Sequence, residues 1–103
     1  MYIAMNRFRV PTDNAAAFEN VWLNRDSQLK DMEGFVEFHM LRGSQENDLI
    51  LYASHTVWRS EEDFRAWTTS EAFREAHKSA GTTRKLHDGR PHFEGFTTIQ
   101  HID

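Results

Sequence analysis

One histidine of this 103-residue chain lies among small apolar side chains. The segment from Ser70 to Ala80 has the pattern of a short amphipathic helix. Within it, Phe73, Ala76, His77 and Ala80 are spaced i, i+3, i+4 and i+7, and residues at this spacing share one helix face. The pattern predicts that the His77 imidazole points to the interior or to a cavity. A neutral imidazole in that position is a good ligand for iron.

A tryptophan ten residues earlier can join this histidine only if the helix is broken. On one unbroken helix, Trp67 and His77 would be rotated apart by roughly 280°. The intervening Thr68-Thr69-Ser70 is polar, and Ser70 is a suitable N-cap for a new helix. The sequence therefore predicts a break there, which lets both side chains face one cavity.

An asparagine in the first predicted strand is the third candidate. Asn6 alternates with Ala4 and Phe8 on one side of that strand, although asparagine is depleted in strands. If this row faces the helices, the buried amide needs hydrogen-bond partners. An amide across an apolar slot from an imidazole is a more specific signal than either residue alone.

Each of these residues also has a purely structural interpretation. His77 fits a hydrogen-bonded core histidine, and Trp67 fits a core anchor. Asn6 fits a structural hydrogen bond to a neighbouring loop or a water-facing edge position. Among the other histidines, His87 is expected in a solvated loop rather than over the site. No histidine has the spacing to a carboxylate that marks a zinc or di-iron site.

The elements that must position these residues follow from periodicity, caps and turn residues. Strands are predicted over 1–10, 35–41, 49–58 and 92–102, helices over 14–30, 61–68 and 70–80, a polar hairpin loop over 42–48 and a loop over 81–91. Ser60 is the expected cap of the second helix. The order β-α-β-β-α-β is the ferredoxin-like pattern, an α+β fold whose four-stranded antiparallel sheet carries its helices on one face. We expect one domain over residues 1–103.

Composition limits the partners of this domain. Aromatic residues make up 13% of the chain, a large apolar load for one small core. Since no predicted helix covers the other sheet face, we expect a homodimer with sheet against sheet. The net charge is -4 and the charges are mixed, which argues against a nucleic-acid partner. No cysteine, membrane-spanning run or signal peptide is present, so we expect no membrane association and a place in the cytoplasm.

Several short strings carry a resemblance to a known family. They are Glu33-Gly34-Phe35, Thr56-Val57-Trp58-Arg59-Ser60, Phe64-x-x-Trp67 and Phe73-x-x-Ala76-His77-Lys78. Together with Asn6, they resemble the Asn-Trp-His triad of the IsdG-like heme-degrading monooxygenases. Those enzymes are dimeric α+β barrels of the antibiotic-biosynthesis-monooxygenase type. The Gly-Phe and Trp-x-Ser strings are shared with many such barrels, whereas the triad is more specific.

The resemblance implies a ruffled heme held between the sheet and the helices. His77 would be the axial iron ligand, Trp67 would press the macrocycle out of plane, and Asn6 would donate a hydrogen bond near the iron. Trp22 and Arg25 correspond to pocket positions on the first helix. Arg25 would contact a propionate, unless it is a plain surface arginine. The implied heme-binding residues are Asn6, Trp22, Arg25, Phe64, Trp67, Phe73 and His77.

The implied reaction uses heme as cofactor and substrate at once. O₂ and electrons from an external reductase or a small-molecule reductant open the porphyrin, releasing iron for acquisition and a linear tetrapyrrole. Two alternatives stay open at this point. One is a cofactor-independent quinone or phenol monooxygenase of the same fold, with His77 as base. The other is a non-catalytic protein, which stores or transfers heme or binds no ligand.

Overall fold

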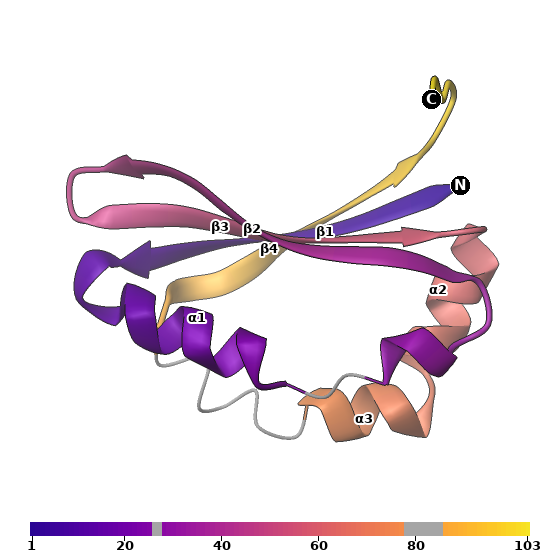
Figure 1. Ribbon diagram of the computed structural model, residues 1–103, viewed down its shortest axis with the longest axis horizontal. Coiled ribbons are helices and arrows are strands. Elements are labelled where there is room, and N and C mark those ends of the chain that lie inside the picture. The colour runs from indigo at the N-terminus through magenta and orange to yellow at the C-terminus, as the bar shows by residue number, and fades with distance from the viewer. Residues whose placement is uncertain (26–27, 78–85) are drawn as a thin grey trace.

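Four strands form one antiparallel sheet in the order β2-β3-β1-β4. The structure is a computed structural model, and it describes residues 1–25, 28–77 and 86–103 of the chain. The strands are β1 (Tyr2–Pro11), β2 (Phe35–Glu46), β3 (Leu49–Trp58) and β4 (Asp88–Thr97). Figure 1 shows the helices on one side of this sheet. The predicted ferredoxin-like α+β fold is therefore confirmed.

The helices are short, and serine side chains cap two of them. They are α1 (Ala15–Leu23), α2 (Glu61–Thr68) and α3 (Glu71–His77), with single 3₁₀ turns η1 (Thr12–Asn14) and η2 (Leu29–Asp31). The Ser60 hydroxyl accepts a hydrogen bond from the Asp63 amide at 3.1 Å, and Ser70 accepts one from the Phe73 amide at 3.1 Å. Both predicted caps are confirmed, and so is the break between α2 and α3.

The pleat of the two central strands decides which side chains reach the helices. On β1, the buried residues are Tyr2, Ala4, Phe8 and Val10, and Asn6 shares their row. On β3, Tyr52, Ser54 and Trp58 are buried on the same side. Because successive strand residues alternate between faces, these rows form the covered face of the sheet.

Two separate apolar clusters lie between the sheet and the helices. One is built on Trp58, Trp67 and Ala76 near α2 and α3. The other is built on Phe8, Phe18 and Tyr52 near α1. The covered face is thus anchored at two places rather than by one continuous core.

The opposite face of the sheet is apolar in its middle. Ile3 and Met5 of β1 are half-buried there, and they pair with Val57 and His55 of β3. Phe96 of β4, which pairs with Ile3, remains 46% exposed. Among the described segments, no helix packs on this face (Figure 1).

The first predicted helix was too long. A helix over 14–30 was expected, but α1 ends at Leu23, which is 83% exposed. The Asn24 side chain donates a hydrogen bond to the Asn20 carbonyl at 2.8 Å, which competes with helix continuation. Gln28 then has a left-handed backbone, with φ of 58°. The apolar pattern continues through this stretch because Leu29 is buried from η2, not because the helix continues.

Strands β2 and β4 also have other bounds than predicted. β2 continues to Glu46 through the expected hairpin loop, because its polar, exposed end still pairs with β3, Gln45 with Ile50 and Glu46 with Leu49. β4 spans 88–97 rather than 92–102. It ends where β1 begins, since the Thr98 amide donates to the Met1 carbonyl at 2.8 Å and no strand lies beyond. The predicted helical residues 78–80 and loop residues 81–85 lie outside the described residues.

Candidate active site

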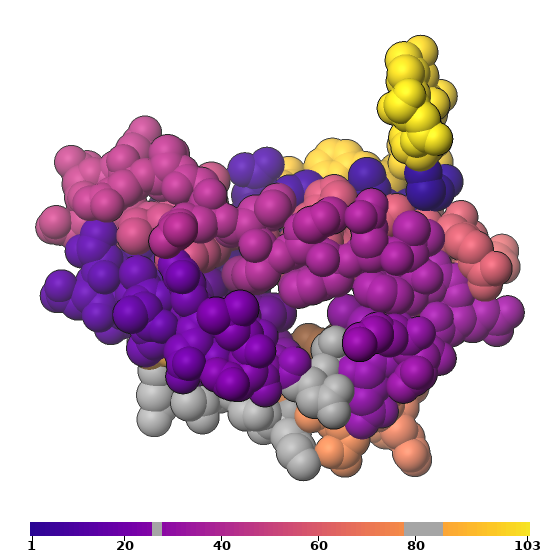
Figure 2. Space-filling view, viewed as in Figure 1, coloured from indigo at the N-terminus to yellow at the C-terminus, as the bar shows by residue number. Residues whose placement is uncertain are grey.

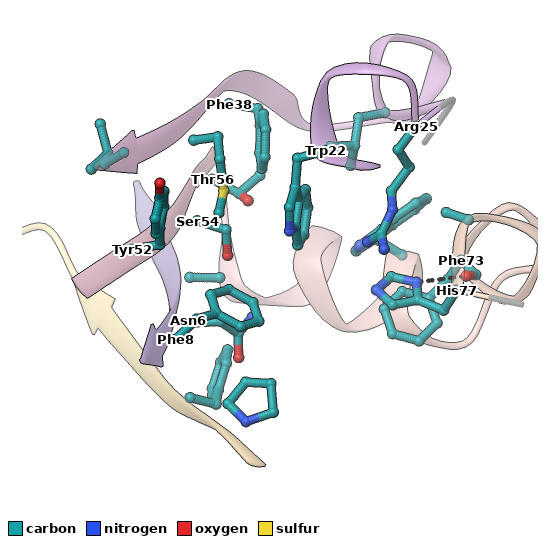
Figure 3. A pocket seen from close by; sticks show the side chains of 18 of the residues that line it. Asn6, Phe8, Trp22, Arg25, Phe38, Tyr52, Ser54, Thr56, Phe73 and His77 are labelled. Carbon is teal, nitrogen blue, oxygen red and sulfur yellow. Dashed lines mark hydrogen bonds between the residues drawn. The ribbon is translucent and has the colours of Figure 1, made fainter. Parts of the chain in front are cut away.

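A cavity of about 1200 Å³ lies between α1, the covered face of the sheet and the α2–α3 pair. It exceeds the usual range of roughly 300–1,000 Å³ for small-molecule pockets. Figure 2 shows the molecule hollowed beside α1, and Figure 3 shows side chains that line the cavity. All seven residues that the sequence nominated line it: Asn6, Trp22, Arg25, Phe64, Trp67, Phe73 and His77.

The His77 ring is held from within its own helix. Its Nδ1 lies 2.8 Å from the Phe73 carbonyl oxygen (Figure 3). A carbonyl only accepts, so Nδ1 carries the proton and the lone pair is on Nε2. The two rings also stack, with centroids 4.1 Å apart. A histidine that ligates a metal almost always donates its other nitrogen in this way.

The exposure of His77 differs from that of a core residue. Ala76 beside it is buried, whereas His77 is exposed and forms part of the cavity lining. The alternative of a buried, hydrogen-bonded core histidine is therefore wrong. The ring is fixed in orientation, yet it remains accessible to a ligand.

Trp67 sits between the apolar cluster and the cavity. It is 6% exposed, and its ring contacts Trp58 and Phe73 at centroid distances of 6.2 and 5.4 Å. It lines the cavity on one side. The residue is thus a core anchor and a rigid cavity wall at the same time.

Asn6 lies on the floor of the cavity, on the central strand β1. Among the residues drawn in Figure 3, its carboxamide has no hydrogen-bond partner. Its neighbour across the sheet is Ser54, and Thr56 also lines the cavity. The sequence indicated Asn6 but missed these β3 hydroxyls, which the alternation of β3 relative to β1 could have revealed.

Trp22 of α1 and Arg25, two residues beyond the end of that helix, bring an indole and a cation to the cavity. Its ring stacks with Phe38 at 6.1 Å and 18°, and the Arg25 guanidinium carbon lies 4.1 Å from the ring centroid. Burial lowers the pKa of Arg25, because a charged group loses hydration there. The interpretation of Arg25 as a plain surface arginine is therefore wrong.

A polar network at the α1 end of the cavity was not predicted. The Tyr52 hydroxyl donates to a Glu19 carboxylate oxygen at 2.5 Å, and Arg42 donates to the same oxygen at 3.1 Å. Burial and the Glu19 carboxylate raise the pKa of Tyr52 to about 12. The signal available in the sequence was a tyrosine on the inward row of β3.

His87 corrects another expectation. It was expected in a solvated loop, but it is 8% exposed and lines the cavity. Its ring packs edge-on against Phe8, with centroids 5.2 Å apart, and against Phe18 at 6.2 Å. Leu86 beside it packs on the second apolar cluster and accepts a hydrogen bond from the Asn14 side chain. These contacts bury the segment although its sequence is polar.

The donor set suits a porphyrin iron better than a bare metal ion. In the part of the chain that the structure describes, no three His, Cys, Asp or Glu side chains gather to hold a metal. His77 supplies one imidazole, as a proximal histidine does for heme iron, and aromatic rings supply flat apolar walls.

None of the helices within the described residues is long and apolar enough to span a membrane.

Comparison with known families and proteins gives a consistent picture. The family model described as antibiotic biosynthesis monooxygenase matches residues 1–79. A curated relative from Staphylococcus saprophyticus, a heme oxygenase that produces staphylobilin, is 30% identical over 84 residues. That match covers 82% of this chain and 80% of the relative.

Two kinds of solved structure share the fold. The heme degrader MhuD from Mycobacterium tuberculosis, with two hemes bound in its active site, has a TM-score of 0.77 and 22% identity over the whole of both chains. A variant of SnoaB, a cofactor-independent oxygenase from Streptomyces nogalater, has a TM-score of 0.73 and 26% identity, covering 98% of this chain and 95% of that chain. The fold therefore occurs both with and without heme.

Proposed function

This chain belongs to the antibiotic biosynthesis monooxygenase family, and from that premise we propose that it is a heme-degrading monooxygenase. Family membership makes it an oxidoreductase of the monooxygenase type. The proposed substrate is heme, which is also the cofactor, and the proposed products are iron and a linear tetrapyrrole. The heme oxygenase from Staphylococcus saprophyticus supports this substrate.

The observation that carries the proposal is the orientation of the His77 ring. The Phe73 carbonyl accepts a hydrogen bond from the Nδ1–H group, which leaves an unprotonated Nε2 on a ring that lines an aromatic cavity. The same tautomer would also suit a general base, but the large aromatic cavity that the ring lines favours heme. A fixed tautomer with a backbone partner is the arrangement that proteins use to orient a metal-binding imidazole.

The proposed roles follow from where the side chains lie. His77 Nε2 binds the heme iron, and Trp67 presses on the macrocycle from a wall that Trp58 and Phe73 hold rigid. Asn6 donates a hydrogen bond from the floor, and Arg25 contacts a carboxylate at the ring edge. Phe64, Phe73 and Trp22 exclude water from the ring. When bound, heme supplies the iron that activates O₂ and the ring that is opened.

The proposed assembly, electron source and place of action are those expected from the sequence. We propose one domain over residues 1–103 that acts as a homodimer, a dimeric α+β barrel, through the uncovered sheet face. The apolar side chains of that face, including the half-exposed Phe96, support the dimer. Electrons come from an external reductase or a small-molecule reductant. The cytoplasm is the proposed place of action, and iron acquisition is the proposed purpose.

A second candidate is a cofactor-independent monooxygenase acting on a quinone or phenol. The SnoaB variant at 26% identity favours it, and so does the polar floor around Asn6, which suits a hydroxylated aromatic substrate. In that case His77 would be the base. A non-catalytic heme-binding protein is the third alternative.

Aerobic turnover of a hemin complex tests the proposal. One equivalent of hemin is added to the protein, and ascorbate is then added under air, with catalase to remove free peroxide. We expect the Soret band to disappear, a tetrapyrrole spectrum to replace it, and mass spectrometry to find a ring-opened product. A bound but unchanged Soret band would identify a storage protein, and no binding would favour the quinone oxygenase.

A further inference from the structure

The cavity contains a second imidazole, which no step of the proposed reaction uses. His87 is more than nine-tenths buried, lines the cavity, and packs on Phe8 and Phe18. Its Nδ1 is buried and has no hydrogen-bond partner within the described residues. A buried polar atom without a partner is energetically unfavourable. An unpartnered imidazole in a cavity wall is therefore a candidate contact for whatever the cavity binds.

His87 differs from His77 in a way that separates their roles. His77 Nδ1 donates a hydrogen bond to the Phe73 carbonyl, so the lone pair on Nε2 is available to a metal. His87 has no such partner on Nδ1. A buried N–H without a partner is rarer in proteins than a buried acceptor without one, which favours the tautomer of His87 with its proton on Nε2. The second imidazole is built to donate a hydrogen bond, not to bind iron.

The charges along the cavity indicate what accepts that hydrogen bond. The charged side chains in the described lining are Arg25, Arg42 and Glu19, and Glu19 is already held by Arg42 and Tyr52. Two arginines against one carboxylate make the described lining net positive, which favours an anionic ligand. Arg25 stands near the free end of α1, at the Trp22 ring, whereas His87 packs on Phe18 and Phe8, within the second apolar cluster. The two groups therefore present different contact points to one ligand.

We propose that His87 Nε2 donates a hydrogen bond to one of the two propionate carboxylates of heme, and thereby fixes how the macrocycle is rotated within its plane. This inference rests on the proposed function, because it assumes a carboxylate-bearing porphyrin. The substituents around the heme ring are not equivalent, so this rotation would decide which meso carbon faces Asn6. His87 is thus a positioning residue that determines which edge of the substrate is opened.

The test compares hemin with hemin dimethyl ester, in which both carboxylates are capped. Quenching of tryptophan fluorescence gives the Kd of each compound for the wild-type protein and for His87→Phe, His87→Gln and His101→Phe. His101 lies in the exposed C-terminal segment and serves as the matched control. Circular dichroism verifies the fold, and His87→Leu replaces His87→Phe if the larger ring is not tolerated.

The quantity of interest is the ratio of the ester Kd to the hemin Kd. We expect this ratio to fall roughly tenfold in His87→Phe, as for loss of a hydrogen bond to a charged group. It should remain unchanged in His101→Phe and recover at least partly in His87→Gln, whose amide still donates. Turnover of His87→Phe should also give a changed mixture of ring-opened isomers.

The results that overturn the proposals are distinguishable. An unchanged ratio in both apolar variants, with hemin still bound, would overturn the role of His87 and leave the proposed function intact. If the wild-type protein bound neither porphyrin, the proposed function itself would fail, and the role of His87 would fail with it.

Discussion

At the scale of single residues, the candidate site consists of side chains that protein contacts hold rigidly, while one atom or face of each remains accessible from the cavity. The Phe73 carbonyl fixes His77 and leaves Nε2 available. Trp67 is locked between Trp58 and Phe73 and still lines the cavity. Preorganisation of this kind is what the proposed reaction requires, because it would depend on a distorted substrate in a water-excluded cavity.

The first prediction concerns the pressure that Trp67 is proposed to exert on the heme macrocycle. Replacing Trp67 with Phe leaves His77, the proposed iron ligand, in place, so the hemin Kd should change less than about threefold. The smaller ring should press less on the macrocycle, and degradation should slow by roughly tenfold, which corresponds to about 1.4 kcal/mol of barrier. Single-turnover kinetics with ascorbate as reductant measure the rate of degradation in both proteins. Equal rates with equal affinity would show that the indole is only a core anchor.

The sequence could predict which residues meet at the site, because helix spacing and strand alternation decide on which face a side chain lies. That reasoning placed Asn6, Trp67 and His77 on one cavity. It could not predict His87, whose burial depends on Phe8 and Phe18, residues far away in the chain. A polar loop composition carries no information about such long-range packing.

At the scale of elements, the joint between α2 and α3 connects two of the candidate residues. The Ser70 hydroxyl donates to the Trp67 carbonyl at 2.7 Å and accepts from the Phe73 amide at 3.1 Å. One hydroxyl therefore ties the end of α2 to the start of α3. The angle between the two helices decides where His77 lies relative to Trp67.

The second prediction separates this joint from an ordinary cap. Ser70→Ala and Ser60→Ala each remove an N-cap, so each should lower the free energy of unfolding by about 1 kcal/mol. Only Ser70→Ala should also weaken hemin binding, by about fivefold, because α3 loses its orientation. Urea unfolding and hemin titration of both variants measure the two effects. Equal hemin affinity in the two variants would mean that the joint does not position His77.

The third prediction uses the contact that ties β3 to α1. Folded Tyr52 has a pKa of about 12, against 10 for the free side chain. The unfolded phenol therefore ionises first, so this stability is fully present below pH 10 and is lost as the pH rises towards 12. The loss amounts to about 2–3 kcal/mol. The wild-type protein should lose stability more steeply than Tyr52→Phe between pH 9 and 11.5.

Urea unfolding across that pH range measures the free energy of unfolding of the wild-type protein and of Tyr52→Phe. Subtracting one from the other cancels the titration of groups that both proteins share. Parallel pH profiles would mean that the phenol is not held protonated by burial and Glu19.

Element order and most element types could be predicted from the sequence, because caps, turns and apolar periods are local. β3, α2 and the break at Ser70 were predicted at their observed positions. The errors lie where tertiary contacts override local pattern. Leu29 is buried from a 3₁₀ turn, not from a continued helix, and β4 ends because β1 offers no further partner.

At the scale of the whole molecule, one face of the sheet carries the cavity and the other carries apolar side chains that no described helix covers (Figure 1). Phe96 is 46% exposed there. An exposed apolar sheet face indicates association with another surface, and a second copy of the chain offers a self-complementary one.

The fourth prediction tests this face. Phe96→Glu places a charge on the half-exposed apolar surface, so the proposed dimer should dissociate to a 12.1 kDa monomer. Leu23→Glu, which changes a residue that is 83% exposed on α1, should leave the dimer intact. Size-exclusion chromatography with light scattering measures the masses. A monomeric wild-type protein, or a dimeric Phe96→Glu variant, would contradict the proposed interface.

Absorption spectroscopy of hemin bound to the wild-type protein and to His77→Ala is the most direct test of the central claim, that His77 Nε2 coordinates heme iron in the cavity. We predict a shifted Soret band at one equivalent for the wild-type protein and for the His101→Ala control. In folded His77→Ala, that shift should be lost and then restored by added imidazole. An identical shifted band in His77→Ala would contradict the account.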